Sequence, residues 1–263
     1  LGDVYKRQAA IYGSRGSCGV ILITTKRGQS EHPVVSYDGQ FSVSNVTKTM
    51  DMLDAYEFAQ IFKEARDGAY LFNVPTGSID DPYESRPQTY HRVDPLITAY
   101  LQDKTGTMVN TDWQDAIFQT ALQHQHQISA QGGTEKIQYY VSASYMDQDG
   151  TIIGSNFNRY SFRANLDAQL KKWLKLGLTA TYTATGDDLK LADSDEGLIN
   201  YSLTTLPDIP IYNLDGSYAT VVREGYTNPN PIALAMMDDI LLDRQKLTGN
   251  IFFEVTPIKN LVW

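Results

Sequence analysis

The chain has 263 residues and a net charge of −9 at pH 7, and 42% of its residues are hydrophobic. This composition is too apolar for a disordered chain, and the acidic balance argues against a broad nucleic-acid interface. The single cysteine, Cys18, excludes an intramolecular disulfide framework. Four histidines and one cysteine also leave little material for a structural zinc site.

Neither a membrane helix nor a secretion signal is visible. No apolar run approaches the roughly 18 residues that a membrane helix needs. The mean hydropathy of −0.33 still permits a membrane β-barrel, because apolar and polar residues alternate along its strands and their hydropathies average out. Residues 1–8 lack the apolar core of a signal peptide. Because the chain lacks an initial Met and stops in apolar sequence, we expect a fragment of a longer protein, with residues 1–8 a non-native leader.

The strongest local signal is the alternation of apolar and polar residues, which predicts strands. Six segments show it, at residues 34–43, 124–131, 137–146, 159–170, 174–184 and 246–255. We expect one face of a continuous sheet to carry Tyr160, Phe162, Leu166, Leu174, Leu176, Leu178, Ile251 and Phe253. We expect the other face to carry Arg159, Arg163, Asp167 and Thr181.

The connections between these segments alternate in length. Tight turns are expected at residues 132–135, 171–172 and 257–260, and long or polar links at 45–121, 147–156 and 185–244. Short turns at one end and long loops at the other are typical of an outer-membrane barrel. A soluble secreted β-sandwich that binds glycans also has one apolar and one polar face, so it is the alternative. A hydrolase is a weaker third reading.

The first long link contains one clear helix signal, over residues 54–65. Asp54 and Glu57 form a capping-box pattern, and Gly68 is a stop signal. The predicted apolar stripe consists of Ala55, Phe58, Ile61, Phe62 and Ala65.

A series of motifs along the chain resembles one family. The motifs are AAIYGSRGSCGVILITTKRG at 9–28, TDWQDAIF at 111–118, GGT at 132–134, YYVS at 139–142, YMDQDG at 145–150, RANLD at 163–167, PIYNLDGS at 210–217 and NP at 230–231. In this order they resemble the SusC/RagA family of TonB-dependent outer-membrane transporters. Cys18 departs from the family's usual Asn, and Gln8 stands where an acidic-Ala lead-in is usual.

The resemblance implies a mainly β fold. Residues 9–31 would form the end of a plug domain, and residues 32–263 would form the first six or seven strands of a larger transmembrane β-barrel. It implies a non-enzymatic importer of oligosaccharides or peptides in the outer membrane of a Gram-negative, Bacteroidetes-like bacterium. The implied partners are a SusD-like lipoprotein, the TonB–ExbB–ExbD energising complex and outer-membrane lipid. The residues that couple such transporters to TonB are not in this sequence.

No catalytic, cofactor-binding or metal-binding residue is assigned. Gly13, Gly16 and Gly19 are followed by a β-branched run and not by a helix, so turn glycines are favoured over a phosphate loop. His124 and His126 share a strand face near the expected outer interface but lack a third ligand. Asp147 and Asp149 are expected to serve a turn at Gly150.

Two sets of polar residues each allow two interpretations. The acidic segment could bind calcium, although a solvated loop is the usual case; it consists of Asp187, Asp188, Asp193, Asp195 and Glu196. The inward-facing polar residues would line a lumen or hold the plug by hydrogen bonds; they are Arg159, Arg163, Asn165, Asp167, Thr179 and Thr181.

Overall fold

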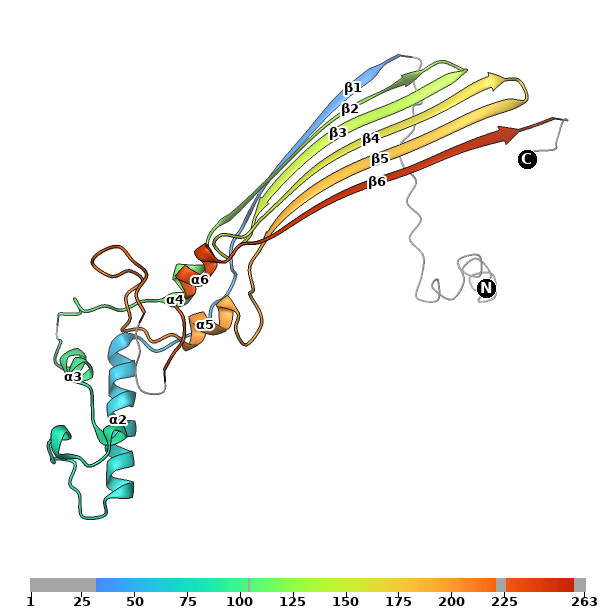
Figure 1. The fold of residues 1–263 in the computed structure, drawn as a ribbon. Helices are drawn as coiled ribbons and strands as arrows, with labels where there is room; N and C mark the ends of the chain where they lie inside the picture. Colours follow the sequence, from blue (N-terminus) through green and yellow to red (C-terminus); the bar gives the residue numbers. More distant parts are fainter. Residues whose placement is uncertain (1–31, 104, 221–225, 258–263) are drawn as a thin grey trace, which may run out of the picture.

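A computed structural model describes residues 32–103, 105–220 and 226–257. These residues form one antiparallel sheet whose six strands follow one another in sequence order, with helices in the long connections (Figure 1). The strands are β1 (Val34–Ser44), β2 (Ala121–Gly133), β3 (Ile137–Asp149), β4 (Asn156–Lys171), β5 (Leu174–Leu189) and β6 (Ile240–Val255). The mainly β prediction is confirmed. The proposed leader 1–8 and plug segment 9–31 lie outside the described residues.

The strand register confirms the predicted facing of the sheet. Phe162 lies opposite Ala143 of β3 and Tyr182 of β5, whereas Arg163 lies opposite Ser142 and Thr181. Directly opposed residues of antiparallel strands share a face, so Phe162 and Arg163 and their partners in β3 and β5 lie on opposite faces of the sheet. The β5–β6 ladder continues the pattern, since Leu178 pairs with Ile251, Leu176 with Phe253 and Thr181 with Thr248.

The apolar face is open to its surroundings. Phe41 and Leu247 are 76% and 75% exposed, and Ile251 and Phe253 are exposed as well. In the described part of the chain there is one sheet, and the helices pack on one another instead of covering it. A sandwich needs a second layer to bury such a face. The sandwich alternative is therefore not favoured.

The strands extend further toward the long links than predicted. β2 begins at Ala121, β5 continues to Leu189 and β6 begins at Ile240, so the connections shrink to 45–120, 150–155 and 190–239. In this region polar residues take several of the outward positions, at His124, Asp147, Asn158 and Asp243. The alternation disappears from the sequence there while the hydrogen-bonded ladder continues, which is why the boundaries were misplaced.

The predicted separation of short and long connections is present. Residues 134–136 and 172–173 close the β2–β3 and β4–β5 hairpins at one end of the sheet (Figure 1). The start of β1 and the end of β6 lie at this end too, because Val34 pairs with Gln131 and Leu174 with Val255. All three long connections leave from the opposite end. The third predicted turn, 257–260, lies outside the described residues after Pro257.

The helices gather at the end with the long links. They are α2 (Ala55–Asn73), α3 (Pro95–Gln102), α4 (Trp113–Ile117), α5 (Leu198–Thr204) and α6 (Pro231–Met237), with 3-10 turns η2 (Tyr83–Ser85) and η3 (Thr89–His91). They enclose two small cores, one around Ile97 and one around Ile117. No helix in the described part of the chain combines the length and hydropathy needed to cross a bilayer.

Helix α2 confirms one prediction and corrects two. The Asp54–Glu57 capping box is present, with reciprocal bonds of 2.7 and 3.1 Å. Gly68 does not end the helix, which continues to Asn73 because Tyr70 packs on the segment that follows. The stripe was also partly wrong, since Ile61 and Ala65 are exposed and Ala59 is buried instead.

Candidate functional site

The polar face of the sheet is the first candidate surface. Arg163 Nε donates to Thr181 Oγ1 at 3.3 Å, and Lys175 Nζ lies 3.5 Å from Asp167. Asn165 is buried in the same face, opposite Thr179. The predicted inward set therefore does share one surface, and neighbouring strands add further Ser and Gln side chains to it. Such a wall suits the passage of a polar solute.

The outward apolar band has the height of a bilayer core. In β4 the outward side chains are apolar from Tyr160 to Leu170. Ten residue steps at about 3.4 Å, tilted by about 40°, give a height of roughly 26 Å, against a typical barrel band of about 25 Å.

An aromatic row marks the end of this band nearest the long links. The rings of Tyr145 and Tyr160 are tilted by 35° with centroids 4.8 Å apart, and the Tyr37 hydroxyl forms a hydrogen bond of 2.6 Å with His126 Nδ1. His124 lies beside them, with Nε2 3.7 Å from Asp147. The two histidines thus lie at the margin of the outward face, and aromatic residues at this position resemble an interfacial girdle.

The acidic segment is divided by the fold. Asp187 and Asp188 belong to β5, where Asp188 lies 3.1 Å from Lys190, while Asp193, Asp195 and Glu196 lie in the following link. Asp147 and Asp149 likewise end β3, and Asn156 donates to both of them. Among the described residues, no three His, Cys, Asp or Glu side chains gather as metal ligands do. Calcium binding stays a prediction that a calcium titration would test.

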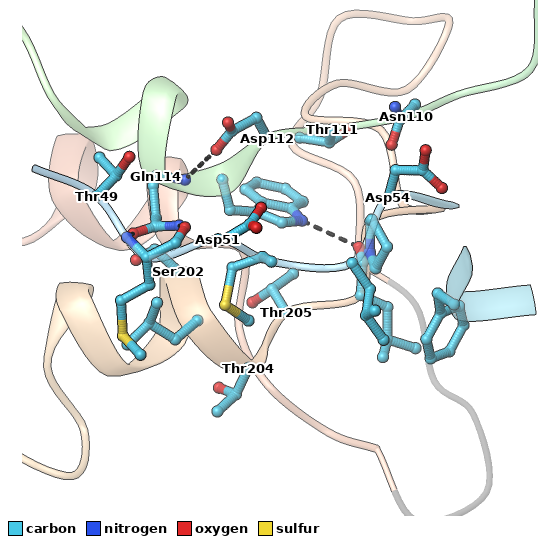
Figure 2. Close-up of a pocket in the computed structure, with 18 residues that line it drawn as sticks. Thr49, Asp51, Asp54, Asn110, Thr111, Asp112, Gln114, Ser202, Thr204 and Thr205 are labelled. Atoms are coloured by element: carbon cyan, nitrogen blue, oxygen red, sulfur yellow. Dashed lines mark hydrogen bonds between the residues drawn. The ribbon is translucent and has the colours of Figure 1, made fainter. Parts of the chain in front are cut away.

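A pocket of about 570 Å³ lies where the long links meet (Figure 2). We call it the loop pocket. Three segments form its walls, namely 49–54 between β1 and α2, 110–114 at the start of α4, and 202–207 at the end of α5. Gln114 holds the first segment through two hydrogen bonds to the backbone of Met50, at 2.9 and 2.7 Å. Trp113 Nε1 donates to Leu206 O at 3.0 Å and ties the second segment to the third.

The lining of the loop pocket is rich in oxygen and negatively charged. Its carboxylates are Asp51, Asp54 and Asp112, and among the described residues no Lys or Arg lines it. Asp54 and Asp112 cap α2 and α4. Thr205 is only 8% exposed, and its Oγ1 is buried without a hydrogen-bond partner among the described residues. The sequence does not predict this pocket, because its three walls are far apart in the chain and only the segment 111–118 carries a recognisable motif.

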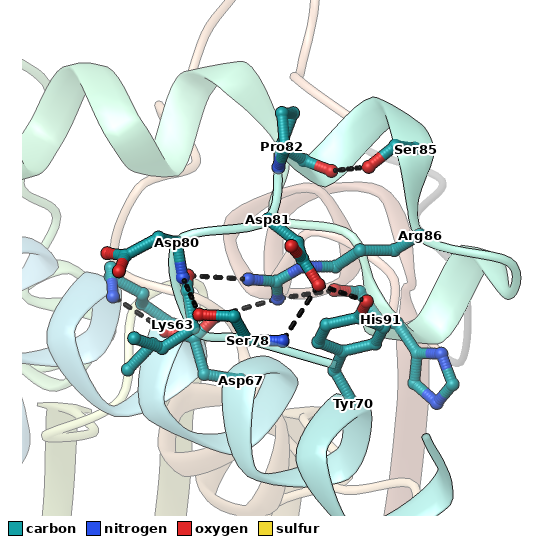
Figure 3. A network of polar contacts seen from close by, with 11 residues as sticks. Lys63, Asp67, Tyr70, Ser78, Asp80, Asp81, Pro82, Ser85, Arg86 and His91 are labelled. Atoms are coloured by element: carbon teal, nitrogen blue, oxygen red, sulfur yellow. Dashed lines mark hydrogen bonds and ion pairs between the residues drawn. The ribbon is translucent and has the colours of Figure 1, made fainter. Parts of the chain in front are cut away.

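A charged network stabilises the link between β1 and β2 (Figure 3). Arg86 is fully buried, donates to Asp67 at 2.7 Å and to His91 O at 3.0 Å, and lies over the rings of Tyr70 and Tyr83. We call residues 55–103, which this network holds together, the loop lobe.

Three carboxyl groups of the loop lobe have lowered pKa values, and two of them, Asp67 and Asp81, lie in the network around Arg86 and Tyr70. Burial by itself would raise the pKa of Asp67, but hydrogen bonds from Lys63 and Arg86 outweigh it and hold that pKa below its usual range. The Tyr70 hydroxyl, followed by the Ser78 amide, lowers the pKa of Asp81. Both groups therefore act as structural anions at neutral pH.

No family model matches the chain. Individual relatives do match. TonB-dependent receptor P3 of Formosa agariphila is 33% identical over 232 residues, covering 86% of this chain and 20% of that protein. TonB-dependent receptor SusC of Bacteroides thetaiotaomicron is 33% identical over 264 residues, covering 92% and 23%. The chain thus spans about a fifth of the curated relatives that it matches.

Solved structures give the same assignment. The RagAB peptide importer in its closed-closed state matches with a TM-score of 0.71 and 25% identity, over 96% of this chain and 29% of that chain. A second RagAB peptide transporter structure matches with a TM-score of 0.69. The separated faces, the ordered motifs and these matches agree, and the chain therefore belongs to the SusC/RagA family of TonB-dependent receptors.

Proposed function

We propose that this chain supplies the first strands and loops of an outer-membrane importer. The observation that carries the proposal is the separation of the two sheet faces. An exposed apolar band of bilayer height lies on one side, and a mainly polar wall, interrupted by residues such as Tyr140, Met146 and Phe252, lies on the other. The apolar face would contact lipid and the polar face would line the lumen, so the chain acts in transport and not in catalysis.

The substrates and partners follow from the relatives. The RagAB complex, one of the solved structures, is a peptide importer. SusC, one of the sequence relatives, is a TonB-dependent receptor. We infer import of peptides or oligosaccharides, with a SusD-like lipoprotein at the end carrying the long links and the TonB–ExbB–ExbD complex acting from the hairpin end. The long links would face the cell exterior and the hairpins the periplasm, as in bacterial barrels.

Cysteine labelling in the full-length protein tests this orientation. Cys18 is first replaced by Ser, and a single cysteine is introduced as Thr76→Cys in the loop lobe or as Glu135→Cys in the β2–β3 hairpin. Both positions are exposed. A membrane-impermeant maleimide should label Thr76→Cys in intact cells, and Glu135→Cys only after the outer membrane is permeabilised. Equal labelling of both positions in intact cells would contradict the proposal.

A further inference from the structure

Three neighbouring strands carry basic and hydroxyl side chains together on the polar face of the sheet. The strand register aligns them in three rows across β4, β5 and β6, namely Arg159–Thr185–Arg244, Ser161–Thr183–Lys246 and Arg163–Thr181–Thr248. We call these nine residues the basic window. Strands about 4.8 Å apart and rows about 7 Å apart give it a size of about 10 by 14 Å. Every side chain in it can donate a hydrogen bond, and none is acidic.

The two arginines of β4 keep most of their donors free of protein partners. Arg159 donates to the Met146 sulfur at 3.4 Å, and Arg163 donates through Nε to Thr181 Oγ1 at 3.3 Å. A guanidinium has five N–H donors, whereas each of these arginines has a single recorded side-chain bond within the described part of the chain. The remaining donors form the planar fork that matches a carboxylate.

The positive charge of the basic window is poorly neutralised. Arg244 lies 3.9 Å from Asp187, a long contact in which 64% of the arginine side chain stays exposed. Lys246 is exposed, and among the described residues no carboxylate forms an ion pair with it. Nearer the hairpins the same face behaves differently, since Lys175 is paired with Asp167 at 3.5 Å. The excess of positive charge is therefore local to the basic window.

The basic window lies in the half of the sheet nearer the long links. It spans 159–163 of β4, whose end at Asn156 is the one from which the long links leave. A solute that enters among the long links would reach it before the hairpin end of the wall. Charged side chains that line a passage concentrate ions of the opposite sign there, and rings of Arg and Lys are used by anion pores.

The proposed plug segment has the wrong charge to neutralise this surface. Residues 9–31 contain Arg15, Lys26 and Arg27 against one carboxylate, that of Glu31. Like charges repel each other, so this segment does not complement the basic window. An anion that comes from outside the chain suits it better.

We propose that the basic window binds the carboxylate groups of an acidic solute during import. Arg159 and Arg163 each hold a carboxylate through paired N–H···O bonds, and the neighbouring hydroxyls donate to the other oxygens of the solute. The inference rests on the proposed import function and narrows its substrates to negatively charged ones. Acidic peptides and uronic-acid oligosaccharides share this chemistry, and matched ligands distinguish them.

Calorimetry on the purified full-length protein in detergent tests the proposal with two pairs of ligands. One pair is acetyl-Glu-Glu-Glu-amide and acetyl-Gln-Gln-Gln-amide, and the other is trigalacturonate and its methyl ester. The charged member of at least one pair should bind about tenfold or more tightly than its neutral partner, and that pair identifies the class of solute. Arg163→Gln should weaken this binding by a similar factor, and Arg163→Lys, which keeps the charge, should weaken it less.

Two lysines provide the matched control. Lys246→Gln removes a charge from the basic window, and Lys172→Gln removes the same charge from the β4–β5 hairpin; both lysines are exposed. Only Lys246→Gln should weaken binding of the charged ligand. Equal binding within both pairs would overturn the proposal, as would charge-dependent binding that Arg159→Gln and Arg163→Gln leave unchanged.

The arginine variants also distinguish a contact with the solute from a contact with the plug. An unchanged affinity in Arg163→Gln, together with entry of vancomycin into otherwise intact cells, would mean that the basic window holds the plug in place, and it would overturn the proposal. If cysteine labelling gives the expected orientation, these results would reject only the acidic solute and not the importer.

Discussion

At the scale of single residues, Arg86 is the side chain on which the loop lobe depends most. Its guanidinium is fully buried against Asp67 and between two tyrosine rings. Removing one partner of a buried ion pair costs about 3–5 kcal/mol when the other charge is left uncompensated, and the loss of Arg86 should cost less than this because Lys63 still pairs with Asp67 at 2.6 Å. We expect Arg86→Met to increase amide hydrogen exchange throughout 55–103. Arg66→Met, which removes only a cation–π contact over Phe62, should cost less than about 1 kcal/mol.

The same network makes the loop lobe sensitive to acid. Because the folded state holds the pKa of Asp67 below its unfolded value of about 3.9, the ionised carboxyl stabilises the fold above that pH. This stabilisation is lost as the pH falls through the folded pKa. Amide exchange of 55–103, corrected for its intrinsic pH dependence, should therefore accelerate below about pH 4.

Asp67→Asn is the matched control for this pH dependence. It should destabilise the loop lobe at neutral pH, because Arg86 loses its counter-charge. The remaining acid dependence should be weaker and should come from groups such as Asp81. An acid response as large as that of the unaltered protein would show that Asp67 is not its source.

At the scale of elements, the two faces of the sheet should respond differently to the same substitution. Leu166 lies near the middle of the apolar band, while Thr179 lies on the polar face at almost the same height. An Arg on the lipid face near the bilayer centre costs about 2–4 kcal/mol. Leu166→Arg should therefore lower the free energy of unfolding of the full-length protein in lipid by about this amount, and Thr179→Arg by less than about 1 kcal/mol. Equal losses would mean that the faces are wrongly assigned.

Helix α2 contains a glycine that the fold does not require. No atom lies within 4 Å of the Cβ position that an alanine would add at Gly68. Gly is about 1 kcal/mol less favourable than Ala inside a helix. Gly68→Ala should therefore slow amide exchange in α2.

Gly154 provides the contrast to Gly68. Its φ is +76°, and the Ala235 carbonyl oxygen lies 2.9 Å from the position of an added Cβ. Gly154→Ala should therefore destabilise the link 150–155. A similar effect of alanine at both glycines would contradict the local geometry.

The strands illustrate which parts of an element the sequence can predict. The alternation in β4 predicted both its existence and its facing, because the two sides of the sheet differ in polarity along most of its length. The strand ends near Asp149 and Leu189 were missed because the alternation breaks there: Asp187 and Asp188 are consecutive polar residues, and the opposing residues Ile240, Leu241 and Leu242 are consecutive apolar ones. The end of α2 was predicted wrongly at Gly68 for another reason. The low helix propensity of glycine is outweighed by the packing of Tyr70 on Arg86 further along the helix.

At the scale of the whole molecule, the described sheet has two free edges. The outer sides of β1 and β6 pair with no other strand among the described residues, and the apolar face is exposed. Open edges and large apolar surfaces lead to association. We expect the 263-residue chain expressed alone to form inclusion bodies and to mediate no uptake. A monodisperse, detergent-free monomer that melts cooperatively would contradict the membrane assignment.

The sequence by itself determined the six strands, the facing of their side chains, the separation of short and long connections and the family resemblance. These features depend on local periodicity and on residues that are contiguous in the chain. Only the tertiary structure decided where the strands end, that α2 continues past Gly68, and that the acidic residues divide between β5 and the following link. The loop pocket and the burial of Arg86 also belong to this second group. Both depend on contacts between residues that are distant in the chain, up to about 150 residues apart in the loop pocket, and only the folding of the chain brings such residues together.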